Sequence, residues 1–104
     1  MSTQKQRDVD VIDRADEEYK EPSLFNVIFL NDDFTPQDFV VALLVHVFKH
    51  EQSVAKRIML QVHNGGRGIA GTYTKEIAET KAAKCTTLAQ ENQFPLEVII
   101  ESRN

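Results

Sequence analysis

An apolar run rich in β-forming residues, Leu24–Leu30, stops abruptly at the polar hexapeptide 31–36. The run predicts a buried strand, and the hexapeptide predicts a turn into a helix because it ends in Thr35 and Pro36. From Pro36 to about Lys49 the apolar residues recur at helical spacing, and a second helix is predicted over roughly 51–63. The first half of the chain is thus committed to one strand followed by two helices.

Glycines and prolines divide the second half of the chain in the same way. The segment Asn64–Gly68 holds three of the four glycines and predicts the end of the second helix. A short strand follows over 69–73, then a helix capped by Thr74 that runs to about Asn92, and a last strand over 96–100 after Pro95. The order β-α-α-β-α-β predicts an α+β fold in which a three-stranded antiparallel sheet packs against three helices.

Length and composition limit the function classes. A chain of 104 residues forms one small domain, predicted over 23–104. Residues 1–23 hold seven acidic and four basic side chains, so they carry −3 of the net charge of −4, and with few apolar residues they predict a disordered N-terminal arm, residues 1–22. The sequence has no basic cluster and no run of about 18 apolar residues, which argues against nucleic acid and membrane partners. Cys85 is the single cysteine, which fits a reducing cytoplasm and predicts neither metal nor cofactor.

The polar hexapeptide is the candidate functional site. Thr35 and Pro36 already supply a helix start, so Asn31, Asp32 and Asp33 are surplus acceptors beside an apolar helix. The second helix is expected to run back antiparallel to the first and so to bring His63 to the same point, over an apolar floor of Val40, Met59 and Val62. This arrangement predicts recognition of a cation. The alternative is a small hydrolase or transferase that uses Asp32 and His63 as an acid–base pair, although no nucleophile accompanies them.

Four motifs in the same order resemble a known family. Residues 31–36 (NDDFTP), 59–63 (MLQVH), 68–73 (GIAGTY) and 78–81 (AETK) are similar to those of the ClpS adaptors, and the resemblance covers roughly residues 23–102. It implies a fold like the C-terminal domain of the ribosomal stalk protein, although a ribosomal role would rest on that analogy alone. It also implies a cytoplasmic adaptor without catalytic activity, and nothing in the sequence demands more than a monomer. Such an adaptor binds N-terminal Phe, Tyr, Trp or Leu of substrate proteins and delivers them to the ClpA unfoldase of the ClpAP protease.

The resemblance also implies the roles of particular residues. Asn31, Asp32 and His63 would hold the substrate's α-amino group. The pocket for the first side chain would be formed by Thr35, Pro36, Gln37, Val40, Met59, Val62 and Leu96. The exposed start of the third helix would face the unfoldase through Glu76, Glu79 and Lys81, and the N-terminal arm would be fed toward its pore. Gln37 departs from the family, in which this gate position is often Met, so the ranking among bulky first residues is left open.

Overall fold

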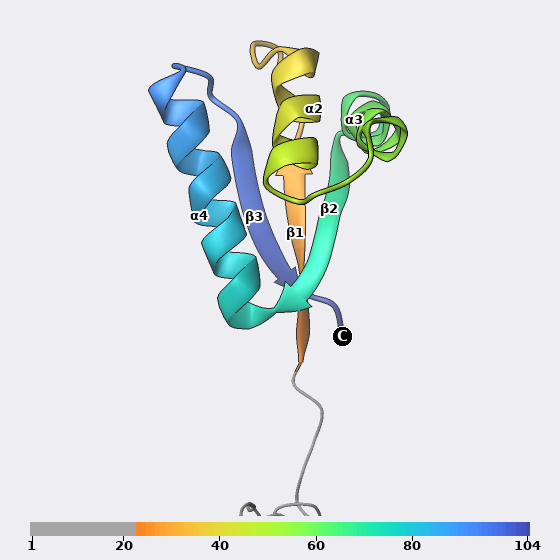
Figure 1. Ribbon diagram of the computed structural model, residues 1–104, viewed down its shortest axis with the longest axis vertical. Coiled ribbons are helices and arrows are strands. Elements are labelled where there is room, and N and C mark those ends of the chain that lie inside the picture. The colour runs from red at the N-terminus through yellow and green to blue at the C-terminus, as the bar shows by residue number, and fades with distance from the viewer. Residues whose placement is uncertain (1–22) are drawn as a thin grey trace, which may run out of the picture.

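The structure, a computed structural model, describes residues 23–104. In that range the elements follow in the order β1 (Leu24–Leu30), α2 (Gln37–His46), α3 (Gln52–Gly65), β2 (Arg67–Thr74), α4 (Lys75–Glu91) and β3 (Glu97–Ser102). The predicted α+β fold, with three antiparallel strands and three helices in the order β-α-α-β-α-β, is confirmed (Figure 1). The predicted arm, residues 1–22, lies outside the described residues.

The sheet has β1 at its centre, in the order β2-β1-β3. Its register contains one bulge, because Val27 pairs with Gly71 while Ile28 pairs with Ile69, which leaves Ala70 as an extra residue in β2. The carbonyl oxygen of Ala70 lies 2.5 Å from Nε2 of His50, so a ring N–H on that nitrogen satisfies this acceptor. His50 thus fastens the loop that contains it to β2.

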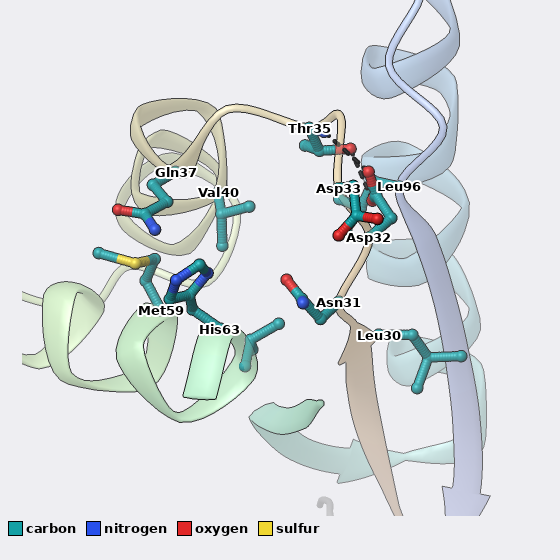
Figure 2. A pocket seen from close by; sticks show the side chains of 11 residues that line it. Leu30, Asn31, Asp32, Asp33, Thr35, Gln37, Val40, Met59, His63 and Leu96 are labelled. Atoms are coloured by element: carbon teal, nitrogen blue, oxygen red, sulfur yellow. Dashed lines mark hydrogen bonds between the residues drawn. The ribbon is translucent and has the colours of Figure 1, made fainter. Parts of the chain in front are cut away.

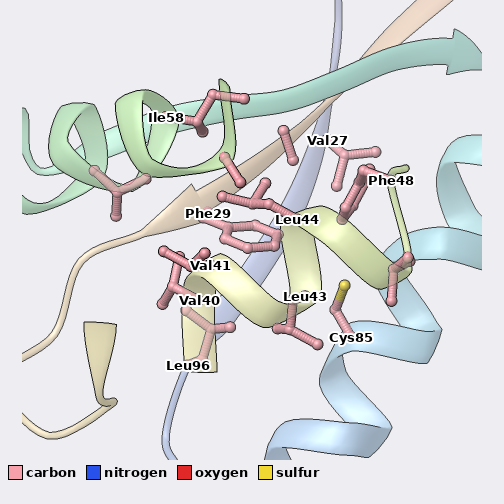
Figure 3. Packing of buried hydrophobic residues seen from close by; sticks show 14 of the residues in the cluster. Val27, Phe29, Val40, Val41, Leu43, Leu44, Phe48, Ile58, Cys85 and Leu96 are labelled. Carbon is pink, nitrogen blue, oxygen red and sulfur yellow. The ribbon is translucent and has the colours of Figure 1, made fainter. Parts of the chain in front are cut away.

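The core lies between one face of the sheet and the helices (Figure 3). Phe29 from β1 and Leu44 from α2 are both 0% exposed, and Cys85 of α4 is equally buried beside them. Phe48 reaches the same cluster and meets the Phe29 ring edge-on, with the ring centroids 5.7 Å apart. Each such buried side chain contributes roughly 1.5–3 kcal/mol. This core holds β1, and therefore the polar segment that follows it, in a fixed position.

The two helices that flank the site are arranged differently from the prediction. Helix α2 ends at His46, three residues before the predicted Lys49, because Lys49 adopts a left-handed conformation with φ of 65°. The His50 N–H donates to the Leu44 carbonyl at 3.1 Å and closes this turn. In Figure 1, α3 is seen nearly end-on beside an upright α2, so the two helices are steeply inclined to each other and not antiparallel.

Candidate functional site

A cavity of about 260 Å³ lies where the polar segment, the first turn of α2, the last turn of α3 and the residue before β3 meet (Figure 2). All of the residues predicted for the amino group and the side-chain pocket line this cavity, with the exception of Pro36. The lining consists of Leu30, Asn31, Asp32, Asp33, Thr35, Gln37, Val40, Met59, Val62, His63 and Leu96. The structure thus brings together residues that lie as far apart in the sequence as Leu30 and Leu96.

The polar segment is built around the Asp32 carboxylate. Oδ1 accepts from the backbone N–H groups of Phe34 at 2.8 Å and Thr35 at 2.7 Å, and Oδ2 accepts from the Thr35 hydroxyl at 2.8 Å. The Thr35 hydroxyl was predicted to cap α2, but it serves Asp32. The position before the helix is occupied by Pro36, and among the described residues no side chain caps α2. Asp32 is therefore not a surplus acceptor, because it holds the loop in shape.

The hydrogen bonds of Asp32 also determine its charge. Partial burial acts to raise the pKa of Asp32, but donation from the Phe34 N–H, the Thr35 hydroxyl and the Thr35 N–H outweighs it, so the pKa lies below its ordinary value of 3.8. The carboxylate is consequently ionised at neutral pH. A carboxylate has about four lone-pair sites, and three are used here, so one on Oδ2 is left for a ligand.

His63 reaches the site because of a backbone link between β1 and the end of α3. The Asn31 N–H donates to the Gly66 carbonyl at 2.9 Å, and Gly66 ends α3 with φ of 90°, a conformation that glycine adopts without strain. This link places the last turn of α3, which carries His63, beside Asn31. Figure 2 shows the Asn31 amide and the His63 ring directed into the same cavity. The predicted convergence is therefore present, but for a reason other than antiparallel helices.

The apolar wall of the cavity draws on three elements. Val40 of α2 is 6% exposed, Val62 of α3 is 3% exposed, and Leu96 before β3 is 6% exposed. The half-buried side chain of Met59 lies beside Val62 on α3. Gly68 has no side chain, and this allows α3 to come close to β2 here. A Cβ at that position would lie only 2.7 Å from Val62 Cγ2. These side chains form the apolar part of the cavity lining, and Leu96 lies beside Asp32 in the polar segment (Figure 2).

Three placements in the site were not predicted. Pro36 is exposed at the start of α2 and is outside the lining of the cavity, since its ring belongs to the backbone turn. Leu30 lines the cavity and was not predicted to do so, although its position as the last strand residue before Asn31 was the signal for it. Asp33, which was predicted as a surplus acceptor but was not assigned to the amino group, also lines the cavity.

The three residues predicted to face the unfoldase lie on α4 in different environments. Glu76 and Glu79 are exposed, and Glu76 lies in the first turn of the helix. Lys81 was predicted to be exposed, but it is half-buried, and its Nζ donates to the Val47 carbonyl at 2.9 Å. The same ammonium lies 5.3 Å from the centroid of the Tyr73 ring. Lys81 thus ties α4 to the loop after α2, and Thr74, predicted to cap α4, makes no side-chain cap bond within the described chain.

The described residues offer little for other classes of site. Between residues 23 and 104 no cluster of three or more His, Cys, Asp or Glu side chains is placed to hold a metal ion. In the same range no helix has the length and apolar character needed to cross a bilayer. Cys85 is buried, and burial raises the pKa of its thiol to about 12, so it is present as an unreactive thiol.

Together, the fold and the cavity define a small α+β binding domain in which a polar loop faces an apolar wall. The family model for the ATP-dependent Clp protease adaptor protein ClpS matches residues 20–99. The chain belongs to the ClpS family and is therefore an adaptor of the Clp protease.

Individual relatives agree with this family. The ATP-dependent Clp protease adapter proteins ClpS of Burkholderia mallei (strain SAVP1) and Burkholderia thailandensis are each 42% identical over 95 residues, and the matches cover 91% of this chain and 91% of each relative. The solved structure of Agrobacterium tumefaciens ClpS2 bound to L-phenylalaninamide is similar to this chain with a TM-score of 0.77 and 37% identity. That similarity covers 80% of this chain and 100% of the other.

Proposed function

We propose that this adaptor binds the N-terminal residue of substrate proteins when that residue is Phe, Tyr, Trp or Leu. It then delivers those proteins to a ClpA-type AAA+ unfoldase of the ClpAP protease. The observation that carries the proposal is the cavity, in which ammonium acceptors and an apolar wall lie side by side. The Agrobacterium relative bound to L-phenylalaninamide supports this ligand class, since that molecule has a free amine and a benzyl group. The single cysteine of this chain fits a cytoplasmic setting.

The amine half of the site matches the chemistry of a free chain end. An α-ammonium group has three donors, whereas an internal peptide bond has one. The site offers the amide oxygen of Asn31, a ring nitrogen of His63 in its neutral form, and the remaining lone pair of Asp32. The negative charge of Asp32 adds attraction for a cation. We assign the α-amino group to these three residues.

The apolar half supplies the preference for bulky first residues. Burial of a Phe or Leu side chain against Val40, Val62 and Leu96 contributes roughly 1.5–3 kcal/mol. Each hydrogen bond to the charged amine contributes about 1.5–3 kcal/mol. Association costs about 4–15 kcal/mol, which the apolar half alone does not offset and which the three hydrogen bonds of the amine offset only at the low end of that range. The site therefore selects a free amine and a bulky apolar side chain in combination.

We assign the contact with the unfoldase to the start of α4. Glu76 and Glu79 present two carboxylates to solvent there, and the internal hydrogen bond of Lys81 anchors the helix that carries them. A charge-reversed variant, Glu76→Lys with Glu79→Lys, is expected to bind peptide normally and to stop stimulating degradation of a Phe-initiated reporter by ClpAP. Unchanged degradation would place the unfoldase contact elsewhere.

The alternative of an Asp32–His63 acid–base pair receives no support from the geometry. Three of the lone pairs of Asp32 are bound within its own loop, and its lowered pKa makes it a weak base at neutral pH. We therefore propose binding without turnover. Incubation of a bound peptide with the adaptor should return the peptide intact, and a cleaved or modified product would favour the enzymatic alternative.

The direct test is fluorescence anisotropy with a labelled peptide that begins with Phe, compared with the same peptide after N-acetylation. The free peptide should bind, and acetylation should weaken binding by at least about 100-fold because it removes the charged donors. His63→Ala should produce a similar loss. The matched control is His46→Ala, since His46 is exposed at the end of α2 and outside the cavity. Equal binding of the acetylated peptide would contradict the proposed function.

A further inference from the structure

Gln37 was assigned to the wall of the side-chain pocket, but that assignment gives its polar amide group no partner. It is the first residue of α2, and its side chain is exposed at the rim. Figure 2 shows its amide directed toward Met59 and His63, across the cavity from the polar segment. No hydrogen bond joins its side chain to another described residue. Gln37 thus offers an uncommitted amide beside the histidine assigned to the amine.

The covalent structure of a chain end explains what such an amide can meet. In any N-terminal residue the ammonium and the first carbonyl are attached to the same Cα, so the first peptide group always lies next to the amine. A ligand amine held by Asn31 and His63 therefore places its first peptide group near one side of the imidazole, and Gln37 lies on the side away from Asn31. A carboxamide carries both donors and an acceptor and is complementary to a peptide group.

We propose that Gln37 is a recognition residue for the first peptide group of the bound chain end. Its Nε2–H donates to the carbonyl of the substrate's first residue, and its Oε1 accepts from the N–H of the second. This inference rests on the proposed function, because it takes the amine position as given. It adds a third criterion to the site, which then reads a free amine, a bulky side chain and a peptide group attached to both.

Three small ligands separate this third criterion from the first two. Phenylalaninamide has the amine, the benzyl group, a carbonyl and an N–H. Phenylalanine methyl ester lacks the N–H, and 2-phenylethylamine lacks the carbonyl as well. Their affinities are measured by competition with a fluorescent Phe-initiated peptide on the full chain. A ratio of affinities on one protein cancels any general effect of a substitution on the pocket.

The key variant is Gln37→Met, which keeps the length of the side chain and removes its polar atoms. The wild type should bind phenylalaninamide more tightly than 2-phenylethylamine, and Gln37→Met should reduce that ratio by about fivefold for each hydrogen bond lost. Gln37→Glu keeps the acceptor and loses the donors, so it should discriminate amide from ester more strongly than the wild type does. The matched control is Gln61→Met, an exposed glutamine of α3 that does not line this cavity.

The possible outcomes are distinct. If Gln37→Met had the same ratio of affinities for phenylalaninamide and 2-phenylethylamine as the wild type, the role of Gln37 would be overturned. The proposed function would still stand, provided that the fluorescent peptide binds. Failure of that peptide to bind the wild type would overturn the proposed function, and the role of Gln37 with it. Folding of each variant is checked by far-UV circular dichroism, and little change is expected because Gln37 is exposed.

Discussion

Substitution of Asp32 by alanine should affect both stability and binding, because one carboxylate serves the loop and the ligand. Asp32→Ala removes three hydrogen bonds, from the Phe34 N–H, the Thr35 N–H and the Thr35 hydroxyl. A hydrogen bond to a charged acceptor contributes about 1.5–3 kcal/mol when fully formed. Water can replace part of this interaction because the loop is partly exposed. We therefore expect the free energy of unfolding to fall by roughly 1–3 kcal/mol in total.

Asp32→Asn separates the two roles. The asparagine oxygen can still accept from both backbone N–H groups, and its NH₂ can donate to the Thr35 hydroxyl oxygen. The loop should therefore keep its shape, with a loss of less than about 1 kcal/mol of unfolding free energy. Binding of a Phe-initiated peptide should nevertheless weaken by about 10- to 100-fold, because the negative charge opposite the ammonium is gone. Asp38→Asn makes the same charge change on α2, outside the cavity, and is the control.

The pH dependence of the stability difference follows from the sign of the pKa shift. The folded pKa of Asp32 is lowered, so the ionised form is the one that stabilises the fold. Its contribution is complete above the ordinary value of 3.8 and is lost as the pH falls through the lowered folded value. In urea denaturation followed by circular dichroism, the gap between wild type and Asp32→Ala should be constant from about pH 8 to pH 5 and should close below about pH 4.

Two results would refute this reasoning about Asp32. If Asp32→Ala were as stable as the wild type at pH 7, the three hydrogen bonds would contribute nothing to the fold. If Asp32→Asn bound the peptide as tightly as the wild type, the carboxylate charge would play no part in holding the amine. The two results are independent, because one is a denaturation midpoint and the other is a dissociation constant.

Two further predictions concern the rest of the site. Met59→Ala should widen the cavity and raise the affinity for Val- or Ile-initiated peptides relative to Phe-initiated ones. Leu60 is 48% exposed on the same helix, and the control Leu60→Ala should leave that ratio of affinities unchanged; equal ratios in the two variants would show that Met59 does not limit the pocket. Gly68→Ala should lower the unfolding free energy by about 1–3 kcal/mol, because the new Cβ would lie 2.7 Å from a methyl carbon of α3. The control is Gly65→Ala, whose Cβ would have nothing within 4 Å, and equal urea midpoints for the two variants would mean that the helix moves away without cost.

The residues of the site could be predicted from the sequence more reliably than their contacts. The segment 31–36 and the motif that ends in His63 have distinctive compositions, and all of their assigned residues except Pro36 line one cavity. The hydrogen bonds could not be predicted in the same way. Thr35 before Pro36 predicts a helix cap, in which the hydroxyl accepts from a backbone N–H, yet Pro36 holds the cap position and the Thr35 hydroxyl donates to Asp32 three residues earlier.

The end of α2 shows the same limit. Apolar residues at helical spacing extend through Phe48, which predicted a helix as far as Lys49. Val47 and Phe48 are indeed buried, but the helix has already ended, because the chain must turn toward β2, where His50 meets the bulge at Ala70. A bulge is a property of the pairing between two strands, so the sequence of α2 contains no sign of it.

The sequence by itself determined the order of the elements, the strand Leu24–Leu30 and the kinds of side chain available for an amine and an apolar group, because these depend on local periodicity and composition. The tertiary structure decided how those side chains meet. Helices α2 and α3 cross steeply because of how they pack. The hydrogen bonds from Asn31 to Gly66 and from Lys81 to Val47 join segments far apart in the chain. Such contacts depend on the packing of the whole core, and no local pattern encodes them.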